Sequence, residues 1–103
     1  MEISKITEKY NLYKEGEIYI IELGDIKRAE DNSVEVRLTQ LEDSSKITIH
    51  PKCGCTVPSY SIVSQSEMTI KLAYQDCESS FSKVTEIRYK NNTTVIKIKG
   101  RCQ

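Results

Sequence analysis

The sequence has no tryptophan, one phenylalanine, one histidine and two prolines in 103 residues. So few large aromatic side chains leave little material for the walls of an apolar pocket, which argues against an enzyme for small molecules. The longest uninterrupted apolar run, residues 18–21, is far shorter than the roughly 20 residues of a membrane-spanning helix. We therefore expect neither a small-molecule substrate nor a membrane as partner.

The N-terminus lacks the basic and apolar segments of a signal peptide. The predicted location is therefore the virion or the cytoplasm, with the periplasm or the cell surface as the alternative if a signal has been removed. In a reducing cytosol, the four cysteines are expected to be thiols that pack as small apolar side chains.

No charge of either sign is in excess, because 15 basic and 15 acidic side chains give a formal net charge of zero. The charge is unevenly distributed: residues 1–82 carry a net charge of −5 and residues 83–103 a net charge of +5. With no overall field to attract polyanions, nucleic acid is an unlikely partner for the whole chain.

Apolar and polar residues alternate along most of the chain, which is typical of half-buried strands. The clearest stretches are Val34–Leu38 and Met68–Tyr74, and Asn91-Asn92 marks a hairpin turn. Short strands at this spacing predict an all-β fold, an immunoglobulin-like antiparallel β-sandwich of about seven strands over residues 16–103. Residues 1–15 are predicted to be an N-terminal arm or short helix, because their apolar side chains are spaced three and four apart.

Two of the four cysteines lie in the stretch from His50 to Pro58, as the pair Cys53-Gly54-Cys55. Structural zinc sites normally use two such pairs, whereas the other two cysteines stand alone in the sequence, so no metal site is favoured. A disulfide from this pair to a distant cysteine is a further alternative. The candidate metal ligands are Cys53, Cys55, Cys77 and Cys102.

Catalysis finds little support. His50 and Cys53 are close in sequence, but no residues are apparent that would orient the histidine or stabilise an oxyanion. Glycine-rich phosphate loops and the HExxH and GxSxG motifs are missing from the sequence. We therefore predict no enzymatic activity and no cofactor.

Basic side chains gather on the polar positions of the last two predicted strands. They suggest a positive face or edge that docks onto an acidic protein surface, or a solvated face that protects a sheet edge from aggregation. Nucleic acid is disfavoured because no aromatic residues are interleaved for base stacking. The candidate partner-binding residues are Arg88, Lys90, Lys97, Lys99 and Arg101, together with Ile3, Ile6 and Tyr10 of the arm.

The run Cys53-Gly54-Cys55-Thr56-Val57-Pro58 resembles the CGCT motif of the domain of unknown function 1573, a family of immunoglobulin-like sandwiches of the ASH and major-sperm-protein type. Other segments follow that family's pattern in order over residues 20–101: Gly24-Asp25-Ile26, Val34–Leu38, Met68–Tyr74, Phe81-Ser82-Lys83, Asn91-Asn92 and Ile96–Gly100. Cys77 and Cys102 are not positions of the family pattern. The resemblance implies a fold and no reaction, because no catalytic residues are established for the family.

These features together predict a non-enzymatic structural or interaction module. The leading hypothesis is an accessory, decorating protein on a large assembly such as a phage capsid. One alternative is an exported periplasmic or surface protein-binding module. Another is a metal-binding or redox protein that uses the Cys53-Gly54-Cys55 pair.

Overall fold

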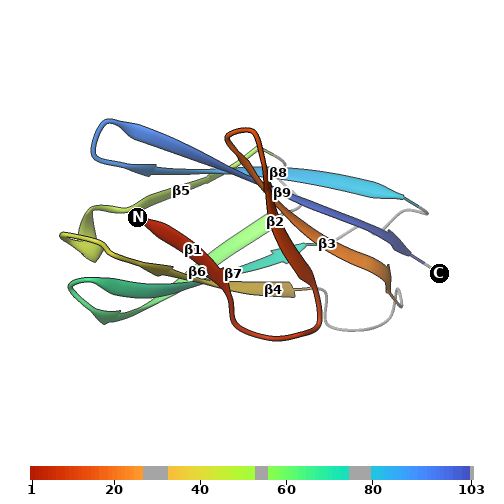
Figure 1. Ribbon diagram of the computed structural model, residues 1–103, viewed down its shortest axis with the longest axis horizontal. Helices are drawn as coiled ribbons and strands as arrows, with labels where there is room; N and C mark the ends of the chain where they lie inside the picture. Colours follow the sequence, from red (N-terminus) through yellow and green to blue (C-terminus); the bar gives the residue numbers. More distant parts are fainter. Residues whose placement is uncertain (27–32, 53–55, 75–79, 103) are drawn as a thin grey trace.

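Two facing β-sheets make up the computed structural model, which describes residues 1–26, 33–52, 56–74 and 80–102 (Figure 1). The first sheet has the order β1 (Glu2–Lys5), β4 (Ser33–Thr39), β7 (Glu67–Tyr74), β6 (Thr56–Ser64). The second has the order β2 (Asn11–Glu15), β3 (Ile18–Ile26), β9 (Asn92–Cys102), β8 (Phe81–Tyr89), β5 (Thr48–Pro51). A short 3₁₀ helix, η1, covers Ser44–Lys46. No helix in these ranges is both long and apolar enough to cross a membrane.

The strand order is that of an immunoglobulin-like sandwich. Strands β1, β4, β7 and β6 take the places of A, B, E and D, and β5, β8 and β9 those of C, F and G. All neighbouring strands are antiparallel except β3 and β9, which are parallel. The predicted all-β sandwich is confirmed, with nine strands in the described residues instead of about seven.

The core follows the alternation seen in the sequence. Every second residue of β4 and β7 is buried, including Val36, Leu38, Ile70 and Leu72, each with 1% or less of its surface exposed. Strands β8 and β9 contribute inward-facing side chains in the same way. Burying an aliphatic side chain of this size stabilises the fold by roughly 1.5–3 kcal/mol.

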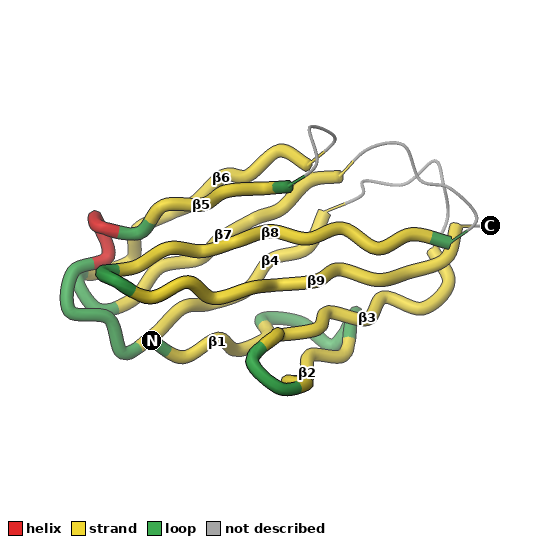
Figure 2. Tube along the Cα trace, turned by 90° about the horizontal axis from the view of Figure 1, so that it is seen from above, coloured by secondary structure: helices red, strands yellow, loops and turns green. Residues whose placement is uncertain are grey.

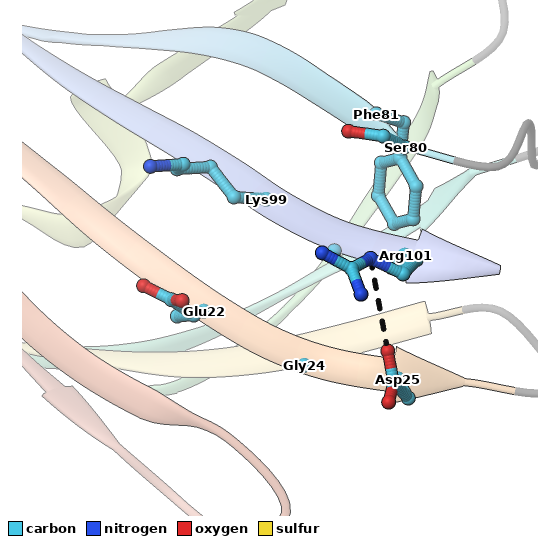
Figure 3. Close-up of a pocket in the computed structure, with 8 residues that line it drawn as sticks. Glu22, Gly24, Asp25, Ser80, Phe81, Lys99 and Arg101 are labelled. Atoms are coloured by element: carbon cyan, nitrogen blue, oxygen red, sulfur yellow. Dashed lines mark ion pairs between the residues drawn. The ribbon is translucent and has the colours of Figure 1, made fainter.

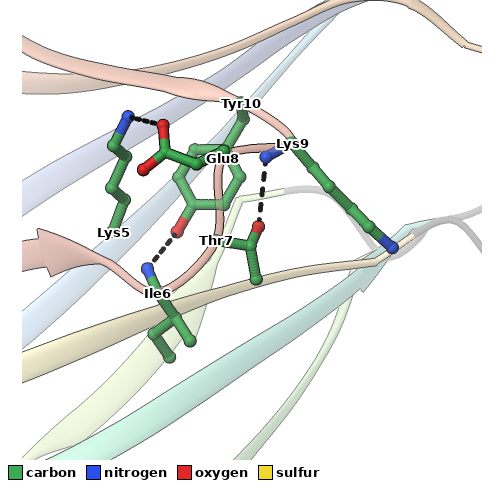
Figure 4. A network of polar contacts seen from close by, with 6 residues as sticks. All are labelled: Lys5, Ile6, Thr7, Glu8, Lys9 and Tyr10. Carbon is green, nitrogen blue, oxygen red and sulfur yellow. Dashed lines mark hydrogen bonds and ion pairs between the residues drawn. The ribbon is translucent and has the colours of Figure 1, made fainter.

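The N-terminal segment is neither a helix nor a free arm, which corrects the prediction for residues 1–15. It forms β1 in one sheet, crosses to the other sheet and forms β2 there. At the crossing, the hydroxyl of Tyr10 accepts a hydrogen bond from Ile6 N at 3.3 Å (Figure 4). The same hydroxyl donates a hydrogen bond to the carbonyl of Glu35. Ile3 and Tyr10 are buried in the core. The helix-like spacing of the apolar residues thus arises from two short strands and a crossing.

Figure 2 shows β1 and β2 along one side of the sandwich and β5 and β6 along the other. The crossing segment closes the first side, where a further hydrogen bond joins Lys9 N to Thr7 Oγ1 at 3.3 Å. One end is closed by η1 and the turn before it, where Tyr89 Oη accepts hydrogen bonds from the backbone amides of Glu42 and Asp43. That turn begins at Gln40, whose φ is 59°.

Candidate functional site

Four of the five predicted basic residues share the outer face of β8 and β9. Arg88, Lys97, Lys99 and Arg101 alternate with the buried positions of these strands, so they point away from the core. The fifth, Lys90, lies in the hairpin turn with φ 56° and does not belong to this face. The hairpin itself was predicted, but Lys90 takes the left-handed conformation in place of an asparagine.

Carboxylates interrupt the basic face. Arg88 and Lys52 both pair with Glu86, at 3.1 and 3.2 Å, and these contacts lower the pKa of that carboxyl, Arg88 contributing most. Outside this face, in the hairpin turn, Lys90 pairs with Glu42 and lowers the pKa of that carboxyl in the same way. The face is therefore a mixture of paired charges and not a uniform positive surface.

Lys97 and Lys99 differ from the other three basic residues. Their cross-strand neighbours on β3 are Ile20 and Glu22. Within the described part of the chain, neither ammonium group has an ion-pair partner at 4.0 Å or less. They are the cations most available to an acidic partner on this face.

A shallow pocket of about 340 Å³ opens where β3 and β9 end and β8 begins (Figure 3). Its lining residues are Glu22, Gly24, Asp25, Ser80, Phe81, Lys99, Gly100 and Arg101. The guanidinium Nε of Arg101 lies 4.0 Å from Asp25 Oδ1. Glu22 accepts a hydrogen bond from Tyr13 Oη at 2.9 Å, which raises the pKa of Tyr13.

A β-bulge brings the charges of this pocket together. From Glu22 to Asp25, β3 advances three residues while β9 advances two, from Lys99 to Arg101. The extra residue is accommodated at Gly24, whose φ of +70° suits glycine. Without the bulge, the side chains of Asp25 and Arg101 would lie on opposite faces of the sheet. The pocket so formed presents carboxylates and cations, which suits binding a charged or polar group.

Three of the four candidate metal ligands, Cys53, Cys55 and Cys77, lie outside the described residues. Cys102 is buried at the end of β9 and is disulfide-bonded, which corrects the expectation of a thiol at this position. A disulfide sulfur is no longer a thiolate and cannot serve as an ordinary metal ligand. The described ranges contain no group of three or more His, Cys, Asp or Glu side chains able to hold a metal ion.

The single histidine lies on the outer face of β5. The ring Nε2 of His50 lies 2.9 Å from Thr48 Oγ1, and in the ladder His50 is opposite Glu86. Its suggested catalytic partner, Cys53, is outside the described residues. The contacts of His50 therefore fit a polar strand residue.

Sequence reasoning missed the most exposed apolar surface, which belongs to β6. Of six exposed large apolar side chains in the described ranges, four are on this strand: Val57, Tyr60, Ile62 and Val63, with 50% to 62% of their surface exposed. The signal was present in the sequence, since residues 56–66 contain no charge in a chain that is 29% charged.

Beside β6 runs an apolar groove of about 280 Å³, referred to below as the β5–β6 groove. Its lining residues are Ile47, Thr48, Ile49, Pro58 and Tyr60. In the antiparallel ladder, Tyr60 and Ile62 lie opposite the buried residues Ile70 and Met68. Directly opposed residues point to the same face. Tyr60 and Ile62 thus extend the row of core side chains sideways into solvent.

No protein-family model, curated protein or solved structure matches this chain. The function is therefore argued from the surfaces themselves, above all from β6.

Proposed function

We propose that the protein is a non-enzymatic interaction module, an accessory protein that binds to a large protein assembly such as a phage capsid. The observation that carries this proposal is the long, uncharged and apolar β6 at the edge of its sheet. Proteins that act alone usually protect an edge strand by making it short or by placing charge on it. An edge without such protection favours contact with another protein chain.

The basic face supports the same proposal as a second contact. Lys97 and Lys99 are the residues proposed to meet an acidic surface of the assembly, since Arg88, Lys90 and Arg101 already have carboxylate partners. A contact of this kind orients a partner and accelerates its binding more than it adds affinity.

The test is sedimentation of the protein from its natural source on a density gradient, followed by mass spectrometry of the heavy fractions. We expect the chain to migrate with a particle far larger than itself and to be released in part at high salt. Lys97→Glu/Lys99→Glu should weaken the association, and Lys9→Glu, which changes an exposed lysine far from this face, should not. Migration as free protein alone would contradict the proposal.

A second candidate function is an exported periplasmic or surface module that binds protein. The observation that favours it is the disulfide-bonded state of Cys102, because disulfides persist in the periplasm and on cell and virion surfaces. Fractionation of cells separates the two candidates. Recovery of the protein in the periplasmic fraction, without any particle, would select the exported module.

A metal-binding or redox role for the Cys53-Gly54-Cys55 pair stays a prediction about residues outside the described ranges. Elemental analysis of the purified chain tests it, and a stoichiometric metal would support it.

A further inference from the structure

We propose that a second copy of this chain pairs with β6, so that two β6 strands run antiparallel about a two-fold axis. This inference rests on the proposed function and deepens it, because it names the first partner of the same unprotected edge.

The four edge strands of the sandwich differ in their protection. Strands β1 and β5 have four residues and β2 has five. β1 carries Glu2 and Lys5, β2 carries Lys14 and Glu15, and β5 ends at Pro51. β6 has nine residues and no charge, and its protecting features are Pro58 and a register shift between Ile62 and Ser64. Of these edges, β6 alone combines length, lack of charge and exposed apolar side chains, which is the pattern of an edge that pairs.

Proline identifies which backbone groups of β6 are free. Pro58 lies opposite Leu72 in the β6–β7 ladder and has no N–H, so it fits a position whose N–H would point away from β7. Backbone groups alternate in direction along an antiparallel strand. Tyr60 and Ile62 therefore also direct their N–H and C=O groups outward, where a neighbouring strand can bind them.

A two-fold axis at Ser61 uses both of these residues. It places Tyr60 opposite Ile62 of the copy, and Ile62 opposite Tyr60 of the copy, so that each pair exchanges two backbone hydrogen bonds. Pro58 then lies opposite Ser64 of the copy, outside the central pairs, so its missing N–H leaves one bond unmade at the end of the ladder and none at the centre. Tyrosine opposite isoleucine is an aromatic and β-branched pair of the kind that stabilises sheets.

The absence of charge on β6 favours a second copy over a charged segment of another protein. When a strand pairs with itself antiparallel, a charge near the axis meets a charge of the same sign, and β6 has none to repel. A charged partner strand would instead lose hydration beside the apolar β5–β6 groove without gaining an opposite charge on β6.

The interface is small. We expect one strand edge and part of a groove to bury less than the roughly 1,200–2,000 Å² of standard stable complexes, so the dimer should dissociate on dilution. The first experiment is analytical ultracentrifugation of the full chain over a dilution series, at neutral pH and moderate salt. The wild-type protein should be a dimer at high concentration and a monomer at low concentration.

The matched variants are Ile62→Lys and Ile18→Lys, which replace an exposed isoleucine with the same charge on β6 and on β3. Ile62→Lys should be a monomer throughout, whereas Ile18→Lys should dimerise like the wild type. Circular dichroism should confirm that both variants are folded. A wild-type monomer at every concentration, or a dimer that Ile62→Lys leaves intact, would overturn the inference.

A cross-link tests the position of the axis. Ser61 meets Ser61 of the copy in a non-hydrogen-bonded pair, where Cα atoms are about 4.5 Å apart, within disulfide range. Ser61→Cys should form a covalent dimer on mild oxidation. Ser59→Cys should not, because its two copies are four residues out of register, roughly 13 Å apart. More cross-linking of Ser59→Cys than of Ser61→Cys would overturn the proposed pairing.

The inference and the proposed function fail separately. A chain that is a monomer in solution but sediments with a large assembly disproves the dimer and leaves the function standing. A chain that dimerises through β6 but is never found on an assembly disproves the function and leaves the dimer standing.

Discussion

The ring of Phe81 lies against the backbone of Gly100, its cross-strand neighbour, so closely that a Cβ added to Gly100 would come within 2.8 Å of Phe81 Cζ. The same ring packs on Tyr74 of the opposite sheet, with ring centroids 5.3 Å apart. Gly100, Phe81 and Tyr74 thus connect the two sheets at the end where the charged pocket opens. Glycine is required at residue 100 because the aromatic ring occupies the place of a side chain.

Replacement of Gly100 by alanine should therefore destabilise the protein by about 1–3 kcal/mol, the usual cost of inserting a methyl group into a packed site. Urea unfolding followed by circular dichroism measures the loss. Phe81→Leu in the same chain should recover part of it, because a smaller side chain leaves room for the new methyl. An unchanged midpoint for Gly100→Ala alone would contradict this packing.

Loss of the Tyr10 hydroxyl should weaken the crossing between the two sheets. Tyr10→Phe leaves the Ile6 amide and the Glu35 carbonyl without this partner, at a cost of about 1–3 kcal/mol. Tyr13→Phe is the matched control, because its hydroxyl is on an exposed residue and binds Glu22. We expect a clear fall in the urea midpoint for Tyr10→Phe and little change for Tyr13→Phe. Equal effects would argue against a stabilising role for the two hydrogen bonds of the Tyr10 hydroxyl.

Acid should destabilise the protein through its paired carboxylates. The pKa values of Glu86 and Glu42 are lowered in the folded state by Arg88 and by Lys90, respectively. A lowered pKa contributes stability above the ordinary carboxyl pKa of about 4.3, and that contribution is lost as the pH falls through the folded-state value. Thermal midpoints at pH 7, 5, 4 and 3 should therefore fall mainly below pH 4.3.

The variants for this prediction are Glu86→Gln and Glu42→Gln. Each should reduce the fall in thermal midpoint between pH 5 and pH 3. Glu17→Gln removes a carboxylate for which the described ranges show no ion pair, and should leave the pH profile unchanged. If all three variants follow the wild-type profile, other groups govern the acid sensitivity.

Cys102 should resist alkylation until the protein is reduced, because it is disulfide-bonded. Iodoacetamide treatment of the unfolded, unreduced chain, followed by peptide mass spectrometry, should leave the peptide containing Cys102 unmodified. After reduction the same peptide should be modified, and the free energy of unfolding should fall by about 2–5 kcal/mol. Modification without reduction would show a free thiol.

The strands that could be predicted from the sequence are those that bury one face and expose the other. In β4 and β7, alternate residues meet the core, and a period of two can be read without knowing the neighbours. The same reasoning failed for Ile3, because β1 is short and its partner β4 is far away in the sequence. It also failed for Tyr10, which lies in the crossing and bonds to the distant Glu35. Strand formation there depends on tertiary pairing.

The surfaces were harder to predict than the strands. The basic residues were placed on one outer face. The Arg88–Glu86 pair is local to β8, but the pairing of Arg101 with Asp25 depends on the strand order and on the bulge at Gly24. The exposed apolar side chains of β6 were missed, although the lack of charge over residues 56–66 was a signal for them. Tyr60 is exposed because β5, the strand opposite it in the other sheet, is short. The length of a strand in the other sheet cannot be read from the residue pattern of β6 itself.

The parallel pairing of β3 with β9 has a consequence for how the chain folds during its synthesis. β3 lies between β2 and β9 in its sheet, so its second ladder cannot form until residues 92–102 have left the ribosome. Until then, Ile21 on β3 lacks the cover of Ile98, its ladder partner. The nascent chain must therefore pass through a stage with unpaired apolar strands, when chaperones or a neighbouring nascent copy can reach it.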